Sequence, residues 1–405
     1  MNNPNLSTKK INHCSFCNKH RDEIAKLIVG DDVGICNECV EYCTTLLTEP
    51  DSTDTLKEEK QSLNPKKLKE FLDQYVIGQD QAKIMLSVAI VNHYKRINSI
   101  DSSVKLDKAN ILMLGPTGSG KTLLAKTVAK YLDVPFAIAD ATSLTEAGYV
   151  GDDVESCITR LLSAADGDVN RAQQGIIFID EIDKISRKSE SASITRDVSG
   201  EGVQQALLKL VEGTICSVPM TAGRKHPKGE MVDIDTSNIL FIAGGAFVGI
   251  DNLIKNRING TCIGFGADVD PLVVVDQRDV IPDDLVRYGL IPEFVGRFPN
   301  WVNLQPLDRT ALIKILTEIK NNYIEQYQWL FRQDDIDLKF ENEAIETIAD
   351  NTLKNKTGAR GLLSEIERIL IPHMFNVVDY RERGIKSLII NNELVNNPEP
   401  LKELS

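Results

Sequence analysis

The fold is decided by one short stretch, Gly115-Pro116-Thr117-Gly118-Ser119-Gly120-Lys121-Thr122. It follows the apolar run 111–114 and precedes the helix-like residues 123–126, so a glycine-rich turn joins a buried strand to a helix. Backbone N–H groups of such a turn converge on phosphate oxygens, and the helix N-terminus adds partial positive charge. The pattern G-x-x-x-x-G-K-[ST] in this context predicts a site for a nucleoside triphosphate rather than a plain glycine-rich turn.

Two residues of this turn have chemical tasks. We expect Lys121 to contact the phosphates directly and Thr122 to offer its hydroxyl to Mg²⁺. The residues expected to bind the nucleotide here are Pro116, Thr117, Gly118, Ser119, Gly120, Lys121, Thr122 and Leu123.

A second stretch, Ile176-Ile177-Phe178-Ile179-Asp180-Glu181-Ile182-Asp183, carries acidic residues at the carboxyl end of an apolar strand. Open α/β sheets place their ligands at that end. Asp180 can orient the Mg²⁺ shell, and Glu181 can polarise the attacking water. The alternative is a buried strand that ends in a solvated acidic turn. The phosphate-binding stretch upstream favours the catalytic interpretation.

The order of elements predicts an α/β fold. Apolar strands at about 110–114, 135–139, 176–180 and 238–243 are separated by helical periodicity, which indicates a parallel sheet with crossover helices. The polar, charged segment after residue 50 reads as a flexible tether. The predicted domains are a zinc-binding domain (1–50), a linker (51–64), a large domain (65–305) and a smaller, mostly helical domain (306–405).

Bulk composition excludes some classes of protein. The chain has 405 residues, 42% of them hydrophobic, and a net charge of −13, which argues against a general nucleic-acid binder. No apolar run reaches the length of a membrane span, and residues 1–5 lack the apolar core of a signal peptide. We therefore expect a cytoplasmic protein that binds neither nucleic acid nor membrane.

Five of the eight cysteines lie in the first 43 residues. The pairs Cys14-x-x-Cys17 and Cys36-x-x-Cys39 have the spacing of a four-cysteine zinc site, in which four thiolates close a tetrahedral, structural centre. So short a segment has too little core to fold securely without the metal. Disulfides and iron are the alternatives. We interpret Cys43 as a small packed residue rather than an alternative ligand.

Together with the nucleotide and cysteine motifs, three further motifs resemble the AAA+ family, and within it the ClpX unfoldases. They are Gly148-Tyr149-Val150-Gly151, Arg224-Lys225-His226 and Ile263-Gly264-Phe265. The resemblance covers nearly the whole chain. It implies an AAA+ P-loop ATPase module, the cofactors ATP, Mg²⁺ and Zn²⁺, and a homohexamer. It also implies unfolding of tagged protein substrates, adaptors that bind the zinc domain, and transfer of the chain to a ClpP-type peptidase.

The resemblance also implies roles for residues whose local sequence says little. Val76 and Ile77 would border the adenine, Arg297 would reach a neighbouring subunit's ATP as an arginine finger, and Arg360 would be sensor 2. On local sequence alone each arginine reads as a surface charge. Sensor 1 has no assignment, because the strand that begins near residue 238 ends in Ala243-Gly244-Gly245.

Three loops would do mechanical work if the resemblance holds. Tyr149 and Val150 would grip a polypeptide, although a tyrosine packed inward in a tight turn is the simpler local interpretation. Residues 224–226 (Arg224, Lys225 and His226) would form a positive pore entrance, or else an ordinary solvated loop. Residues 263–265 (Ile263, Gly264 and Phe265) would dock into the peptidase, or else fold back onto the core.

Rival functions stay open at this point. A nucleic-acid remodelling ATPase, without a peptidase partner, would show hydrolysis stimulated by DNA or RNA in a salt-dependent way. A zinc scaffold would show no ATP turnover. An HslU-like unfoldase is disfavoured by the cysteine pairs. We find no family-matched nucleophile with an oriented base, so we expect peptide cleavage on a separate protein.

Overall fold

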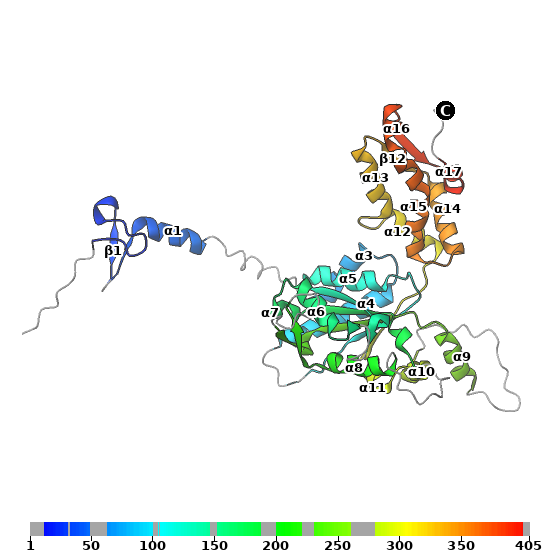
Figure 1. Cartoon of the computed structure of the whole chain (residues 1–405), viewed down its shortest axis with the longest axis horizontal. Coiled ribbons are helices and arrows are strands. Elements are labelled where there is room, and N and C mark those ends of the chain that lie inside the picture. The colour runs from blue at the N-terminus through cyan, green and yellow to red at the C-terminus, as the bar shows by residue number, and fades with distance from the viewer. Residues whose placement is uncertain are drawn as a thin grey trace, which may run out of the picture. The chain divides into compact units, whose positions relative to one another are not determined.

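The computed structural model describes residues 12–30, 33–48, 63–99, 104, 106–145, 152–187, 200–220, 231–260 and 280–399. The chain divides into two compact units, Met1–Leu63 and Asn64–Ser405 (Figure 1). Among the described helices, none combines the length and the apolar character that a membrane crossing requires.

The first unit is built around its cysteines. A turn of 3-10 helix, η1 (Arg21–Glu23), precedes an antiparallel hairpin of β1 (Leu27–Val29) and β2 (Gly34–Cys36), and helix α1 (Asn37–Thr48) follows directly. Its buried core consists of cysteines, with only a few partly buried apolar side chains packed against them. So small an apolar core cannot stabilise an independent fold without a cross-link or a metal.

The second unit contains a five-stranded, all-parallel sheet with the order β11-β3-β10-β7-β4. The strands are β3 (Ile111–Leu114), β4 (Phe136–Asp140), β7 (Ile176–Asp180), β10 (Leu240–Gly245) and β11 (Asn300–Asn303). Burial of β3 and β10 is complete, as expected for strands covered by helices on both faces. The predicted α/β class is confirmed, and the four predicted strands are all present.

The fifth strand, β11, is not among the predicted strands. Its sequence, Asn-Trp-Val-Asn, is short and has polar residues at both ends, so it gives no periodic apolar signal. It joins the sheet through parallel pairing with β3, in the register Asn300↔Ile111. Tertiary pairing, and not local pattern, makes this segment a strand.

Helices surround the sheet. The first of them, α3 (Pro65–Asp73), begins where the Asn64 side chain accepts a hydrogen bond from Lys66 N and Pro65 fills the first turn. The others are α4 (Asp80–Asn98), α5 (Lys121–Leu132), α6 (Ser156–Ala164), α7 (Val169–Ala172), α8 (Glu201–Glu212), α9 (Ile250–Gly260), α10 (Pro282–Tyr288) and α11 (Pro292–Gly296). Short 3-10 turns are η2 (Ala141–Ser143), η3 (Ile182–Ile185) and η4 (Thr236–Asn238).

Two small strand pairs lie beside the main sheet. The parallel pair β5 (Leu144–Thr145) and β6 (Asp152–Asp153) flanks residues 146–151, and the antiparallel pair β8 (Ile215–Pro219) and β9 (Met231–Asp235) flanks residues 221–230. Each pair therefore fixes the two ends of a segment that the sequence marks as a candidate working loop.

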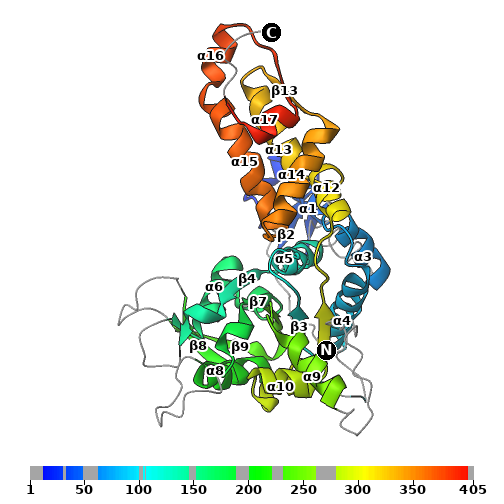
Figure 2. The same ribbon diagram turned by 90° about the vertical axis from the view of Figure 1, so that its right-hand side faces the viewer.

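The C-terminal part has its own apolar core, which includes Leu312, Phe331 and Leu362. Figures 1 and 2 show its helices gathered around β12, apart from the five-stranded sheet. They are α12 (Arg309–Thr317), α13 (Tyr323–Gln333), α14 (Asn342–Lys354), α15 (Ala359–Phe375), α16 (Val377–Glu382) and α17 (Asn392–Asn396). The strands β12 (Asp337–Phe340) and β13 (Ser387–Ile390) form one parallel pair within this mostly helical region.

Candidate functional site

The glycine-rich turn leaves the carboxyl end of β3 and leads directly into α5. Gly118 and Gly120 have φ values of +80° and +100°, in the left-handed region that favours glycine. A Cβ on Gly120 would meet nothing within 4 Å, so open space lies over the helix start. The turn therefore exposes backbone N–H groups and the positive end of α5 to open space. This is the arrangement that binds a phosphate.

Gly118 also contacts the C-terminal part of the unit. A Cβ at this position would lie 2.7 Å from Thr357 O and 2.9 Å from the Cα of Gly358. Ala359 N donates a hydrogen bond to Gly118 O at 3.2 Å. The phosphate turn and the start of α15 therefore approach each other at backbone distance, and only glycine fits between them.

Lys121 lies deep in this turn. Its Nζ donates to Gly115 O at 2.6 Å and to Pro116 O at 3.0 Å, and the residue is 8% exposed. Burial lowers the pKa of Lys121, while Asp180 and Asp183 act in the opposite direction. A phosphate in the adjoining space would supply the negative charge that this buried ammonium needs.

Thr122 and the acidic end of β7 meet at the same place. The Thr122 hydroxyl donates to Asp180 Oδ2 at 3.1 Å, and Asp180 Oδ1 accepts from Glu181 N at 2.9 Å. Glu181 has a φ of +58°, a left-handed conformation that is costly for a residue with a Cβ. A hydroxyl and a carboxylate oxygen side by side form a donor set suited to Mg²⁺.

These groups line one cavity of about 330 Å³, which we call the nucleotide cavity. Its volume is in the range of small-ligand sites. Its walls come from the phosphate turn, from the end of β7, from the segment after β10 and from the C-terminal helices. The lining residues are Thr117, Gly118, Gly120, Lys121, Thr122, Leu123, Asp180, Glu181, Asp183, Lys184, Ala246, Val248, Tyr323, Ala359 and Arg360.

The cavity thus brings together most of the residues that the sequence marks for ATP. Arg360, at the start of α15, reaches it from the C-terminal part. Pro116 and Ser119 do not line the cavity directly, but the Ser119 hydroxyl donates to Pro116 O at 2.8 Å and so braces the turn. Val76 and Ile77 also lie outside its lining. Val76 is 6% exposed, and Ile77 packs against the C-terminal core.

The segment after Val76 is tied to the connection between the two parts. The Gln79 side chain donates from Nε2 to Gln305 O at 2.7 Å and accepts at Oε1 from Gln305 N at 2.9 Å. Lys320 donates from its backbone N to Gln74 O at 2.9 Å and from its Nζ to Gln74 Oε1 at 2.6 Å. Gln74 and Gln79 therefore hold the segment expected to border the adenine, through hydrogen bonds to Lys320 and Gln305.

Arg297 lies away from this cavity. It follows α11, is not part of the lining, and pairs with Glu212 of α8 through Nε at 2.8 Å. The expected loop residues Tyr149, Val150, Arg224, Lys225, His226, Ile263, Gly264 and Phe265 lie outside the described residues.

Sequence reasoning missed several residues of the cavity. Tyr323 and Val248 carry no motif and come to the cavity through tertiary packing alone. Asp183 and Lys184 stand two and three residues after Glu181 in the sequence. This closeness was a signal that they could also line the cavity. Among them, Asp183 is a buried acid, at 3% exposure.

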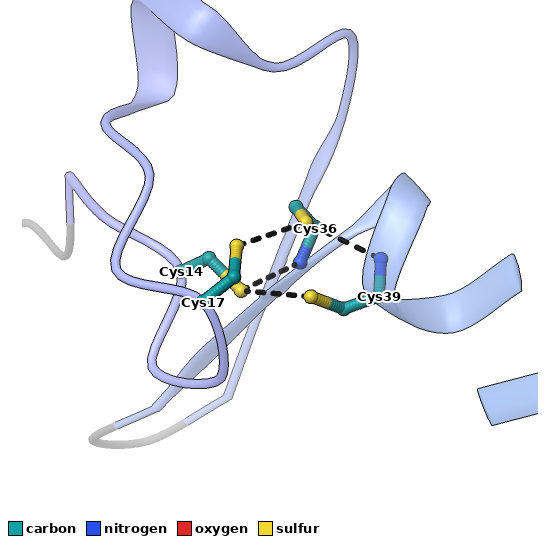
Figure 3. Close-up of side chains that lie close together, drawn as sticks. All are labelled: Cys14, Cys17, Cys36 and Cys39. Carbon is teal, nitrogen blue, oxygen red and sulfur yellow. Dashed lines mark hydrogen bonds between the residues drawn. The ribbon is translucent and has the colours of Figure 1, made fainter. Parts of the chain in front are cut away.

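The cysteine cluster of the first unit has the geometry of a tetrahedral metal centre (Figure 3). The four Sγ atoms of Cys14, Cys17, Cys36 and Cys39 all lie within 4.8 Å of one another. Sγ separations are 3.9 Å for Cys14 and Cys39 and 3.7 Å for Cys17 and Cys36. Zn–S bonds of about 2.3 Å place tetrahedral sulfurs about 3.8 Å apart, whereas a disulfide requires about 2 Å. The spacing therefore fits zinc and not disulfides.

The backbone favours ionised sulfur at Cys14, whereas burial and the neighbouring cysteines raise the pKa of Cys39. Cys36 N donates to Cys14 Sγ at 3.3 Å, and Cys39 N donates to Cys36 Sγ at 3.4 Å. Burial alone would raise the pKa of Cys14, but hydrogen bonds from N–H groups of Cys17, Phe16 and Cys36 outweigh it and lower that pKa to about 6. Thiolates are the form that binds zinc. Cys43 is not part of the cluster.

Comparison with known proteins agrees with both sites. Residues 12–49 match the ClpX C4-type zinc finger, residues 106–301 match the AAA domain (Cdc48 subfamily), and residues 307–380 match the C-terminal, D2-small domain of ClpB protein. The ATP-dependent Clp protease ATP-binding subunit ClpX of Treponema denticola is 52% identical over 391 residues, which cover 95% of this chain and 94% of the relative. The chain therefore belongs to the ClpX family: it is an AAA+ ATP hydrolase with an N-terminal zinc-binding C4 finger.

Proposed function

We propose that this ATPase unfolds tagged proteins and passes them through a hexameric ring into a ClpP-type peptidase. The relative from Treponema denticola is named as the ATP-binding subunit of an ATP-dependent protease. We infer from this name that one subunit hydrolyses ATP and another cleaves peptides. The observation that carries the proposal is the nucleotide cavity, whose walls come from the sheet and from α15 together. A nucleotide bound there touches both parts, so a change in its charge can move one against the other.

Within this proposal, each residue at the cavity has one task. Lys121 and the N–H groups of the turn bind the phosphates, and Thr122 with Asp180 holds Mg²⁺, which supplies charge neutralisation at the phosphates. Glu181 polarises the attacking water. Arg360 contacts the nucleotide and so couples it to α15 and to the other helices of the C-terminal apolar core.

We infer the ring of subunits from the position of Arg297. Because this arginine does not line its own cavity and lies exposed at the end of α11, we propose that it completes the cavity of a neighbouring subunit. In its own subunit it is held by Glu212, an exposed pair of little energetic value that a stronger anion can displace.

The proposed substrate path uses the loops. Tyr149 and Val150 grip the polypeptide, residues 224–226 form the positive entrance, and residues 263–265 dock on the peptidase. Support comes from β5–β6 and β8–β9, which fix the ends of the first two segments. The zinc domain receives adaptors. A cytoplasmic location stays a prediction from the sequence.

One mixture tests the proposal. The full chain is incubated with ATP, a stable folded protein carrying a terminal tag, and a ClpP-type barrel, and loss of the folded substrate is followed. We expect degradation that requires ATP and all three proteins. ATP turnover without unfolding, together with salt-dependent stimulation by DNA or RNA, would instead identify a nucleic-acid remodeller.

Two variants divide the steps of this reaction. Tyr149→Ala should keep ATP turnover and lose unfolding, because only the grip is removed. Phe265→Ala should keep unfolding and lose degradation, because only docking is removed. Intact binding of the Phe265→Ala protein to the barrel would contradict the docking role.

A further inference from the structure

The carboxyl end of β10 leads to the nucleotide cavity, which the next residue, Ala246, lines, and it brings no polar side chain there. Its last residues and the one that follows are Ala243, Gly244, Gly245 and Ala246. A Cβ on Gly244 would lie 2.7 Å from the Phe178 ring, and a Cβ on Gly245 would lie 2.6 Å from the Phe247 ring. Side chains are therefore sterically excluded at both glycines, and any polar group at this wall must come from another element.

Asp183, in η3 after β7, supplies that group. Its Oδ1 accepts a hydrogen bond from Ala246 N at 3.1 Å, and a Cβ on Gly245 would lie only 2.9 Å from this oxygen. The aspartate thus lies beside Gly245, where a side chain on that residue would crowd it. Because η3 directly follows the acidic end of β7, Asp183 and Glu181 both line the cavity.

The second oxygen of Asp183 has no hydrogen-bond partner within the described part of the chain, although it is buried. The nearest cation is Lys184 Nζ at 3.9 Å, beyond hydrogen-bond distance, on a side chain that is 54% exposed. A buried carboxylate oxygen without a partner is unfavourable, because it has lost its hydration without gaining a hydrogen bond. An unpaired oxygen of this kind, on a residue that lines a cavity, indicates a ligand or a water molecule.

The chemistry of the cavity limits what Oδ2 can bind. A carboxylate and a phosphate oxygen are both negative and repel each other, so direct contact with the nucleotide is unfavourable. The ammonium of Lys121 donates two of its three hydrogens to backbone carbonyls, and the third is the one that can bind a phosphate. A water molecule is the donor that fits a small space between the carboxylates and the phosphates.

We propose that Asp183 is a positioning residue for ATP hydrolysis, whose Oδ2 accepts a hydrogen bond from the attacking water. A water molecule has two hydrogens, and Glu181 and Asp183 can each accept one. The lone pairs of the water oxygen then face away from both carboxylates and toward the phosphate side of the cavity. When the water oxygen forms its bond to the γ-phosphorus, the bond between that phosphorus and the ADP oxygen breaks and ADP leaves. Glu181 takes one proton of the water, and Asp183 keeps the orientation fixed through its bond to Ala246 N. The inference rests on ATP hydrolysis and not on protein unfolding.

Asparagine separates this role from a structural one. In Asp183→Asn, the side-chain oxygen can still accept from Ala246 N, while the second position changes from an acceptor to an NH₂ donor. Asp183→Ala removes both functions. A residue that only braces the segment after β10 would tolerate asparagine and not alanine.

The experiment uses the full chain and measures binding as well as turnover. We determine the midpoint of thermal unfolding without nucleotide and the Kd values for ADP and for a non-hydrolysable ATP analogue. We also determine the Kd for ADP with Mg²⁺ and aluminium fluoride, a complex that mimics the transferring phosphate with its water. For Asp183→Asn we expect an unchanged midpoint and unchanged Kd values for ADP and the analogue. Affinity for the aluminium fluoride complex should fall about 10-fold or more, and kcat should fall roughly 10- to 100-fold with KM within about two-fold.

Two further variants complete the test. Asp284→Asn changes another fully buried aspartate, whose oxygens are paired with Arg257 Nε and Ile281 N, and it should lower the thermal midpoint without weakening the aluminium fluoride complex selectively. Lys184→Met tests the neighbouring cation. Wild-type kcat and fluoride affinity in Asp183→Asn, with losses only in Asp183→Ala, would overturn the proposal in favour of a structural brace. Equal losses in Lys184→Met and Asp183→Asn would also overturn it, in favour of an ion pair. Because no protein substrate is used, neither outcome depends on the unfoldase proposal.

Discussion

The zinc cluster and the nucleotide cavity are built in opposite ways. All four cluster cysteines come from positions 14 to 39 of one small unit, and each pair is separated by two residues. The cavity draws on positions from Thr117 to Arg360. One site depends on local backbone geometry, and the other depends on how distant elements pack.

The two sites differ in what a substitution would remove, which is stability at the zinc cluster and chemistry at the cavity. A tetrahedral centre of four thiolates is the main source of stability for its unit, because the surrounding apolar core is small. The cavity lies in a unit with two extensive apolar cores, so its chemistry can be removed without unfolding the chain. Substitutions at the two sites should therefore change different observables.

The largest effect is expected for Cys36→Ala. Structural zinc contributes apparent free energies of about 10–16 kcal/mol in zinc-finger peptides, far more than this unit can replace by packing. We expect bound zinc, measured by atomic spectroscopy, to fall to near zero and the first 63 residues to become sensitive to protease. ATP turnover should stay within about two-fold of the parent.

Cys43→Ala is the matched control for this prediction. Because Cys43 lies outside the cluster, the variant should keep its zinc. Loss of zinc from Cys43→Ala would mean that the cluster uses a different set of four sulfurs.

Glu181→Gln should have the next largest effect. Removal of a general base typically costs about 100- to 10,000-fold in rate, while the phosphate turn keeps its geometry. We expect turnover to fall by that factor and the Kd for ATP, measured with a fluorescent analogue, to change less than about three-fold. Glu393→Gln, an exposed acid on α17, is the control. Near-parental turnover in Glu181→Gln would remove this residue from the chemistry.

Gly118→Ala tests the contact between the two parts of the cavity. The added Cβ would lie 2.7 Å from Thr357 O, in addition to the cost of a φ of +80°. We expect roughly 2–4 kcal/mol of lost stability by chemical denaturation and at least 10-fold weaker nucleotide binding. Gly384→Ala, with a φ of +74° and nothing within 4 Å, isolates the backbone cost alone. Equal losses in the two variants would show that the contact contributes nothing.

The smallest effect is expected for Gln79→Ala. It removes two hydrogen bonds to the Gln305 backbone, each worth about 0.5–1.5 kcal/mol. We expect a loss of about 1–2 kcal/mol by denaturation. Gln205→Ala removes one bond within a single helix and should cost less. A Gln79→Ala protein as stable as Gln205→Ala would show that this connection is not held by the glutamine.

Sequence reasoning could name candidate residues where chemistry depends on neighbours along the chain. The phosphate turn, the acidic end of β7 and the cysteine pairs are each contained within a few residues, so their spacing already specifies their geometry. The four apolar strands were also predictable, because buried parallel strands are nearly continuous apolar runs.

The same reasoning failed where a residue acquires its role from a distant partner. The strand β11 exists because it pairs with β3, and Tyr323 lines the cavity because α13 is placed beside it. In the sequence Asp183 is the last acid of the stretch 176–183 and has no assigned role. Its importance becomes visible only when one oxygen is bonded to Ala246 and the other is buried without a partner among the described residues.

The linear order of residues was thus enough to specify a phosphate-binding turn, a metal cluster and an α/β sheet, because each depends on spacing, periodicity or backbone conformation over short range. The folded chain was needed to show that the start of α15 bonds to the phosphate turn, that Gln79 holds the connecting segment, and that Asp183 bonds to the residue after β10. These three features depend on steric exclusion and hydrogen bonds between distant segments, which no local pattern encodes.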